Sequence, residues 1–151
     1  MPLIDGTFGN LAGPPSLASC TRDVYADGAR FDAPQALAIA HGIASAVCQL
    51  HARGIVHGDL YGHNILHADG GACLLGDFGA ASMFVPGSPQ GDLLQGIEAR
   101  AFGVLLGELI AHGATPLPFL QALQQACLQE EVLRRPKFDV IERALLEMLQ
   151  A

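Results

Sequence analysis

The chain has 151 residues, of which 50% are hydrophobic, and its 8 Lys and Arg against 15 Asp and Glu give a net charge of −7. This length suits one domain with a core large enough to fold alone. The few basic residues are dispersed, which excludes a nucleic-acid surface, and no stretch approaches the roughly 18 apolar residues of a membrane span.

The cysteines and the N-terminus bear on the cellular compartment. The 4 cysteines lie far apart and form no Cys-x-x-Cys pair, which favours a reducing compartment over a disulfide framework. The first residues carry neither a basic region nor an apolar stretch, so no signal peptide is predicted. We therefore expect a cytoplasmic protein.

The segment at residues 1–31 is predicted to be mostly irregular. It is rich in Gly, Pro and Asp, and Gly13-Pro14-Pro15 is a firm break. After that break, Ser16 is predicted to start a short helix that reaches Tyr25.

The main unit, residues 32–151, is predicted to open with a long amphipathic helix. Asp32 has the features of an N-cap, with proline in the first turn and glutamine at the capping-box position. Apolar residues then recur at spacings of three and four as far as Leu50, and Gly54 ends the helix as the glycine after the C-cap.

A small β-hairpin is predicted next. The elements are, in order, a strand stub at 55–56, a loop at 57–63, a first arm at 64–67, a turn at 68–71 and a returning arm at 72–75. Such a hairpin brings Asn64 and Asp77 to the same end of two paired strands. Spacing alone therefore places two oxygen ligands side by side.

The remainder is predicted to be helical. Residues 80–96 are interrupted by Ala, Gly and Pro and are expected to form a loop, whereas residues 97–110 are apolar on almost every side, as in a buried helix. Glu98 in that helix is expected to be buried and bonded to backbone, because an unpaired buried charge is costly. Prolines open two further helices, at 116–128 and 136–149, so the expected class is α+β, mainly α-helical.

The densest group of reactive side chains lies between His57 and Gly79. Mg²⁺ prefers oxygen ligands together with substrate phosphates. Asp77 offers a carboxylate, Asn64 offers an amide oxygen, and Asp59 is placed to accept a proton from an attacking hydroxyl. Phosphoryl transfer depends mostly on positioning and charge neutralisation, so one base and two ligands are a minimum set for it.

Each of these residues also has a structural interpretation. Asp and Asn often cap turns through their own side chains, and His57 is more typical of a hydrogen-bonded core histidine than of a base. His57, His63 and His67 together suggest a zinc site, but no cysteine or fourth ligand lies near them in the sequence.

The pattern His57-Gly58-Asp59-Leu60-Tyr61-Gly62-His63-Asn64, followed by Asp77-Phe78-Gly79, resembles the catalytic and metal-binding loops of the protein-kinase superfamily. The resemblance extends over about residues 34–150. Glu98 to Leu106 are similar to the family's buried helix F, and Leu133-Arg134-Arg135-Pro136 resemble the Arg-Pro pair before the last helix. The Gly-Pro-Pro stretch resembles a bacterial subgroup.

The resemblance implies a kinase C-lobe in which a small β-hairpin carries the catalytic and metal loops, and residues 1–31 derive from the hinge. It implies Asp59 as catalytic base and Asn64 and Asp77 as ligands of Mg²⁺ on bound ATP, with a protein hydroxyl as acceptor. His57 and Phe78 would be internal packing residues, and Glu98 would anchor the catalytic loop.

Several family features are missing from the sequence. It contains no Gly-rich phosphate loop, strand lysine or partnering glutamate, so we expect a truncated kinase whose exposed lobe face meets an N-lobe or a partner chain, with the N-lobe encoded just upstream of Met1. Gly58 replaces the usual arginine, and Arg135 is expected to lack its usual partner. Two alternatives stay open: an inactive pseudokinase that serves as an interaction module, and a small-molecule kinase of the aminoglycoside type.

Overall fold

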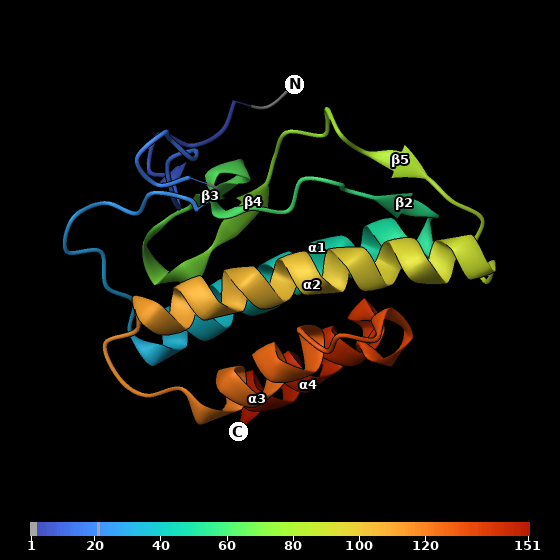
Figure 1. Cartoon of the computed structure of the whole chain (residues 1–151). Helices are drawn as coiled ribbons and strands as arrows, with labels where there is room; N and C mark the ends of the chain where they lie inside the picture. The colour runs from blue at the N-terminus through green and yellow to red at the C-terminus, as the bar shows by residue number, and fades with distance from the viewer. Residues whose placement is uncertain (1–2, 21) are drawn as a thin grey trace.

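The computed structural model describes residues 3–20 and 22–151, and it is mainly helical with two small antiparallel sheets. The helices are α1 (Ala33–Ala52), α2 (Pro89–Ala111), α3 (Pro118–Cys127) and α4 (Phe138–Gln150), and the strands are β1 (Gly9–Asn10), β2 (Ile55–Val56), β3 (Ile65–His67), β4 (Cys73–Leu75) and β5 (Ser82–Met83). In Figure 1 the strands lie on one side of α1 and α2, and α3 and α4 lie on the other. The expected α+β, mainly helical class is confirmed.

Helix α1 begins and ends as predicted. The Asp32 carboxylate accepts the backbone N–H of Gln35 at 2.8 Å, and the Gln35 side chain accepts the N–H of Asp32 at 3.1 Å, so both halves of the capping box are present. Gly54 follows the C-cap with φ +70°, a conformation that suits glycine.

The predicted short helix from Ser16 to Tyr25 is wrong over its described part. Residues 17–20 form a turn in which the Ser16 and Ser19 hydroxyls accept each other's backbone N–H groups, at 3.2 and 2.8 Å. Serine side chains that bond nearby backbone offer an alternative to helix formation. Thr21 lies outside the described residues, as do Met1 and Pro2.

The predicted hairpin is confirmed, with shorter arms. Strands β3 and β4 pair in antiparallel register, Ile65 opposite Leu75 and His67 opposite Cys73. The unforeseen strand β1 pairs with the free edge of β3, which ties the N-terminal segment to the hairpin. Asn64 belongs to a 3-10 turn, Gly62–Asn64, instead of the first arm.

The predicted loop at residues 80–96 is wrong, because β5 and the first two turns of α2 lie there. Ser88 caps α2 by accepting the N–H of Gly91 at 3.0 Å, and proline occupies the first turn. Gly96 is not a break: a Cβ there would lie 2.7 Å from the Val132 carbonyl oxygen, so glycine permits close packing. The predicted helix at 97–110 is the later part of α2.

The last two predicted helices are confirmed, with boundaries shifted by about two residues. Arg135 was expected to lack its usual partner in the family, and the structure shows it bonded to backbone instead. Its guanidinium donates to the backbone carbonyls of Gly96, Gln129 and Glu130 at 2.9, 2.7 and 3.3 Å. Arg135 thus joins the middle of α2 to the connection before α4.

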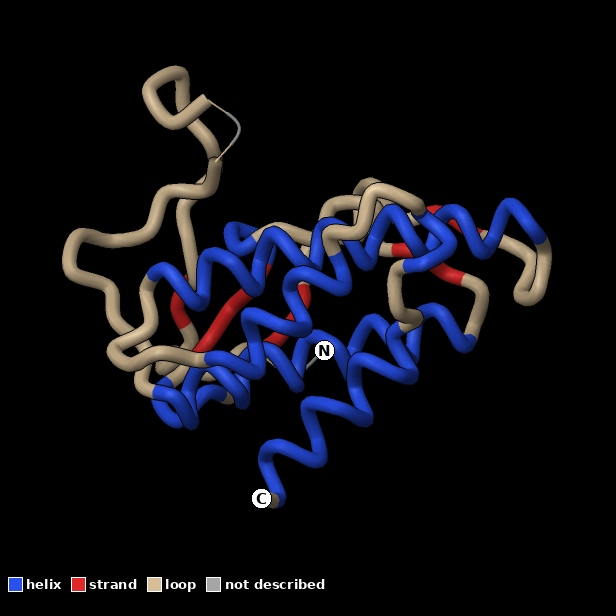
Figure 2. Tube along the Cα trace, turned by 60° about the horizontal axis from the view of Figure 1, so that its bottom comes forward, coloured by secondary structure: helices blue, strands red, loops and turns tan. Residues whose placement is uncertain are grey.

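The core lies where α1 packs on α4 and α2 packs on α3. Figure 2 shows the helices grouped side by side, with one loop projecting from the body. None of the described helices is long and apolar enough to cross a membrane. The largest fully buried side chains are Ile39, Ile43, Leu60, Ile65, Phe102, Leu105, Leu106, Leu109, Leu120, Phe138, Ile141 and Leu145.

The close packing at Gly96 predicts that replacement by alanine changes the stability of the protein in opposite directions at two glycines of α2. Alanine in a helix interior normally stabilises by about 1 kcal/mol relative to glycine. We expect Gly96→Ala to destabilise by about 1–3 kcal/mol through overpacking against Val132 backbone. Gly107→Ala is the matched control, since its new methyl meets only the movable end of Gln124 and should be neutral or stabilising. Urea unfolding of both variants measures the two changes in stability. Equal changes would contradict the conclusion that close packing requires glycine at position 96.

Candidate active site

Glu98 of α2 holds the loop that follows β2. Its carboxylate accepts the backbone N–H groups of His57 and Gly58 at 3.1 and 2.8 Å, and it lies 2.7 Å from Nε2 of His51 on α1. Glu98 is only 4% exposed, so this buried carboxylate is satisfied by three hydrogen bonds. The predicted role of Glu98 as a buried anchor of the loop backbone is confirmed.

The pKa of Glu98 reflects these contacts. Burial alone raises the pKa, but the hydrogen bond to His51 and those from the Gly58 and His57 amides outweigh it and hold the pKa below its ordinary value. Glu98 is therefore an ionised carboxylate at neutral pH, and its charge is used to fix backbone.

Gly58 occupies a position where a side chain does not fit. Its φ is +80°, and a Cβ there would collide with the carbonyl oxygen of Ala80. The family's arginine is therefore replaced by glycine in a loop that approaches the 80–81 backbone very closely.

His57 is a hydrogen-bonded core histidine, as predicted. It is fully buried, its Nε2 lies 2.7 Å from the carbonyl oxygen of Gly76, and its Nδ1 accepts the N–H of Asp59 at 3.3 Å. His57 therefore joins the loop that carries Asp59 to the loop that carries Asp77. Phe78 packs edge-on against it at 4.9 Å, but the prediction that Phe78 is an internal residue is wrong, because it is 50% exposed.

Asp59 and Asn64 are brought together. The Asn64 amide donates to the backbone carbonyl of Asp59 at 2.8 Å and to its carboxylate at 2.9 Å. Asn64 is 8% exposed, so its orientation is fixed, and its amide oxygen is the atom left for another partner. Asp59 is half-buried and lines a pocket of about 300 Å³ with Pro15, Cys20 and other residues.

The backbone just before Asp77 is hydrogen-bonded to Asn64. The N–H of Gly76 donates to the carbonyl of Asn64 at 2.8 Å, so Asp77 directly follows the paired strand end, as the hairpin predicted. Its side chain, however, is exposed and accepts the N–H of Gly79 at 3.2 Å, in a left-handed conformation with φ +51°. No described hydrogen bond joins the Asp77 carboxylate to Asp59 or Asn64.

The oxygen atoms of this site suit a hard cation. Asn64 uses its amide N–H groups on Asp59, which leaves its oxygen as a ligand, and one carboxylate oxygen of Asp77 makes no described hydrogen bond. Among the residues that the structure describes, no three His, Cys, Asp or Glu side chains gather as a metal site. His63, which the zinc alternative would use, is instead bonded to Asp23 at 2.9 Å.

The N-terminal segment contributes contacts that the sequence did not reveal. Asp23 accepts both the backbone N–H of His63, at 3.0 Å, and its ring Nδ1. Tyr25 donates to Glu108 at 2.8 Å and stacks on His112 at 4.4 Å. Burial and the neighbouring carboxylates of Glu108 and Asp23 raise the pKa of Tyr25 above its ordinary value. No local pattern signals these contacts, because the partners lie 40 and 83 residues apart.

Comparison with known proteins indicates similarity to protein kinases. The family described as protein tyrosine and serine/threonine kinase matches residues 16–88, a span that contains Asp59, Asn64 and Asp77. The matched span is just under half of the chain and supports similarity to a fragment of a protein kinase domain, in a family of phosphotransferases. The chain is 26% identical over 113 residues to the tyrosine-protein kinase SRK3 of Spongilla lacustris. This alignment covers 62% of the chain and 34% of that protein. The chain thus spans about a third of the length of this relative.

The anchor predicts a pH-dependent loss of stability in Glu98→Gln. Because the pKa of Glu98 is lower in the folded than in the unfolded chain, its stabilisation is complete above the ordinary glutamate pKa of about 4.3 and is lost as the pH falls through the folded value. We expect the variant to lose about 3 kcal/mol at pH 7 and progressively less as the pH falls below the ordinary glutamate pKa. Urea unfolding across this range measures the effect, with Glu147→Gln on exposed α4 surface as control. A loss that is independent of pH would contradict the ionised anchor.

Proposed function

We propose that the chain is the C-lobe of a protein-kinase-type phosphotransferase that uses ATP and Mg²⁺ to phosphorylate a protein hydroxyl. In this proposal Asp59 is the catalytic base, and Asn64 and Asp77 are the metal ligands. The observation that carries it is the 2.9 Å bond from the Asn64 amide to the Asp59 carboxylate, in a loop whose backbone Glu98 holds. Similarity to the protein kinase family supports ATP and Mg²⁺ as the cofactors.

Asp59 is suited to receive a proton. Its carboxylate is half-buried, opens onto a pocket and accepts one hydrogen bond from Asn64, which leaves a second oxygen for the acceptor hydroxyl. The oxygen that loses this proton forms the new bond to phosphorus while the bond to the leaving phosphate oxygen breaks. His57 receives the N–H of Asp59 and so helps to hold the base in place.

Asn64 and Asp77 would hold the cation from one end of the hairpin. The ion would neutralise phosphate charge, and the residues would fix its position relative to Asp59. The Gly76–Asn64 backbone bond and the His57–Gly76 contact support this pairing, because they keep both loops in register. In the same proposal residues 1–31 are hinge-derived and residues 32–151 form the lobe.

A metal titration tests the ligand assignment. Mn²⁺ replaces Mg²⁺ at oxygen sites and broadens nearby NMR signals. In the presence of ATP we expect broadening centred on the amides of Asn64 and Asp77, with at least a tenfold weaker effect in Asp77→Asn because a charged ligand is lost. Asp69→Asn, an exposed aspartate on the turn of the same hairpin, is the matched control. Broadening that persists in Asp77→Asn would remove this residue from the site.

Transfer of radiolabelled γ-phosphate tests the reaction. The 151 residues contain no Gly-rich phosphate loop or strand lysine, and loss of such preorganised groups costs several kcal/mol of transition-state stabilisation. We therefore expect the chain alone to transfer nothing measurable to a protein acceptor, and activity to need an N-lobe added in trans or in cis. That activity should fall by about 10²–10⁴ in Asp59→Asn. Reconstituted transfer that survives this substitution would refute the base, and transfer to aminoglycosides alone would favour the small-molecule kinase.

A further inference from the structure

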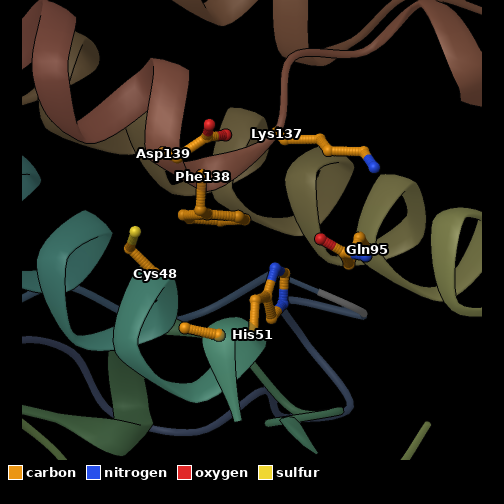
Figure 3. Close-up of a pocket in the computed structure, with 7 residues that line it drawn as sticks. Cys48, His51, Gln95, Lys137, Phe138 and Asp139 are labelled. Atoms are coloured by element: carbon orange, nitrogen blue, oxygen red, sulfur yellow. The ribbon is translucent and has the colours of Figure 1, made fainter. Parts of the chain in front are cut away.

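The central helix α2 has one side that the other described elements leave open. Its opposite side is packed: Gln95 lines the pocket of Figure 3, which His51 of α1 and Phe138 of α4 also line. Since an α-helix turns by 3.6 residues, positions 97 and 104 face away from position 95. Ile97 and Val104 are accordingly 58% and 38% exposed, and in Figure 1 no labelled element crosses the side of α2 toward the viewer. An exposed apolar side on the main helix of a small domain is a candidate interface.

The residues on this open side are spaced as in a helix–helix seam. They follow one another at alternating intervals of four and three residues, and they are Leu93, Ile97, Arg100, Val104, Gly107 and Ala111. A repeat of this kind keeps one stripe of a helix facing a partner helix over several turns. We call these six residues the α2 seam. Gly107 is half-buried and the other five are exposed, so the seam is open over a length of about 27 Å.

Two opposite charges at the seam are not paired with each other inside the chain. Arg100 is exposed and takes part in none of the ion pairs or side-chain hydrogen bonds among the described residues. Glu108 lies one turn beyond Val104, and none of the described ion pairs includes it. Eight residues of helix span about 12 Å, which keeps Arg100 away from Glu108 of its own chain.

Glu108 lies in an environment that favours an added cation. Its Oε2 accepts the Tyr25 hydroxyl at 2.8 Å, and it lines a pocket of about 440 Å³ together with Val104 and Gly107. Burial raises the pKa of Glu108 above its ordinary value, and although the hydrogen bond from Tyr25 lowers it, the nearby carboxylate of Asp23 raises it again. A guanidinium group placed over this pocket would therefore stabilise the carboxylate.

We propose that the α2 seam is the interface of a symmetric homodimer, in which the α2 helices of two copies pack antiparallel. A second copy is favoured because the seam is complementary to itself. Paired about its midpoint, it places Leu93 opposite Ala111, Ile97 opposite Gly107 and Arg100 opposite Val104 of the second copy. The two largest apolar residues thus meet small ones, which permits two helices to approach closely.

The same register pairs the charges. The stem of Arg100 lies on Val104 of the second copy, and its guanidinium reaches Glu108 of the second copy, one turn further along. Because the dimer has twofold symmetry, this ion pair forms twice. The association does not depend on the proposed kinase reaction.

Sedimentation equilibrium of the full chain tests the dimer. At about 100 µM we expect twice the mass of one chain, because a small interface of this kind gives a Kd in the micromolar range. Ile97→Glu should raise the Kd by about a hundredfold, since it places a carboxylate from each copy inside the seam. Val140→Glu is the matched control, because Val140 is 53% exposed on α4, and it should leave the Kd unchanged.

Charge reversal tests the register. Arg100→Glu and Glu108→Arg should each be monomeric alone, because either change brings like charges together twice in the homodimer. An equimolar mixture of the two variants should dimerise again, since every reversed charge then meets an opposite one. Arg143→Glu, at an exposed position of α4, is the control and should dimerise as the unaltered chain does.

Three results would overturn the homodimer. They are a monomer at about 100 µM, which would leave the seam to a different kind of partner, a dimer that survives both Ile97→Glu and Arg100→Glu, and equal dissociation by Val140→Glu. Both seam substitutions are at exposed positions, so they decide the matter even if Glu108→Arg disturbs the fold. A mixture that stays monomeric, although both variants keep the circular dichroism of the unaltered chain, would refute the pairing of Arg100 with Glu108.

Discussion

The structure depends on one buried carboxylate. Glu98 lies on the central helix α2, yet its side chain makes all three of its hydrogen bonds outside that helix. Two are to the backbone of the loop after β2 and one is to His51 on α1. A loop of that length has no regular hydrogen-bond ladder of its own, so its amides need an outside acceptor. A charged acceptor makes the strongest such bonds, which explains why an otherwise apolar helix carries an acid at this point.

Other irregular segments are also held in place by single polar side chains that make several hydrogen bonds. Arg135 satisfies three carbonyl groups around the connection before α4, and Asp23 satisfies an amide and a ring nitrogen of His63. In each case one side chain with several donors or acceptors joins an irregular segment to another part of the fold. The helices supply the packing, and a few polar side chains hold the connecting loops in one conformation.

The sequence predicted what is local or strongly periodic. The capping box at Asp32, the hairpin and the buried Glu98 follow from short patterns, and so does the neighbourhood of Asp59 and Asn64. The predictions failed where one residue type can serve two structural purposes. The loop predicted at residues 80–96 includes Gly96, which instead permits contact between α2 and Val132. Ser16 is the predicted start of a helix, but its hydroxyl forms a turn. Contacts such as Asp23 with His63 span 40 residues and leave no periodic signal.

The two halves of the candidate site are held to different degrees. Asp59 and Asn64 are bonded to each other and rest on His57 and Glu98, so their geometry is set before any ligand arrives. Asp77 is exposed, and its side chain is occupied only by the amide of Gly79. Electrostatic stabilisation of a transition state requires groups that need no reorganisation. In the proposed function, Asp77 would therefore be the adjustable ligand: a cation shared with Asn64 would fix the carboxylate against the rigid Asp59 loop.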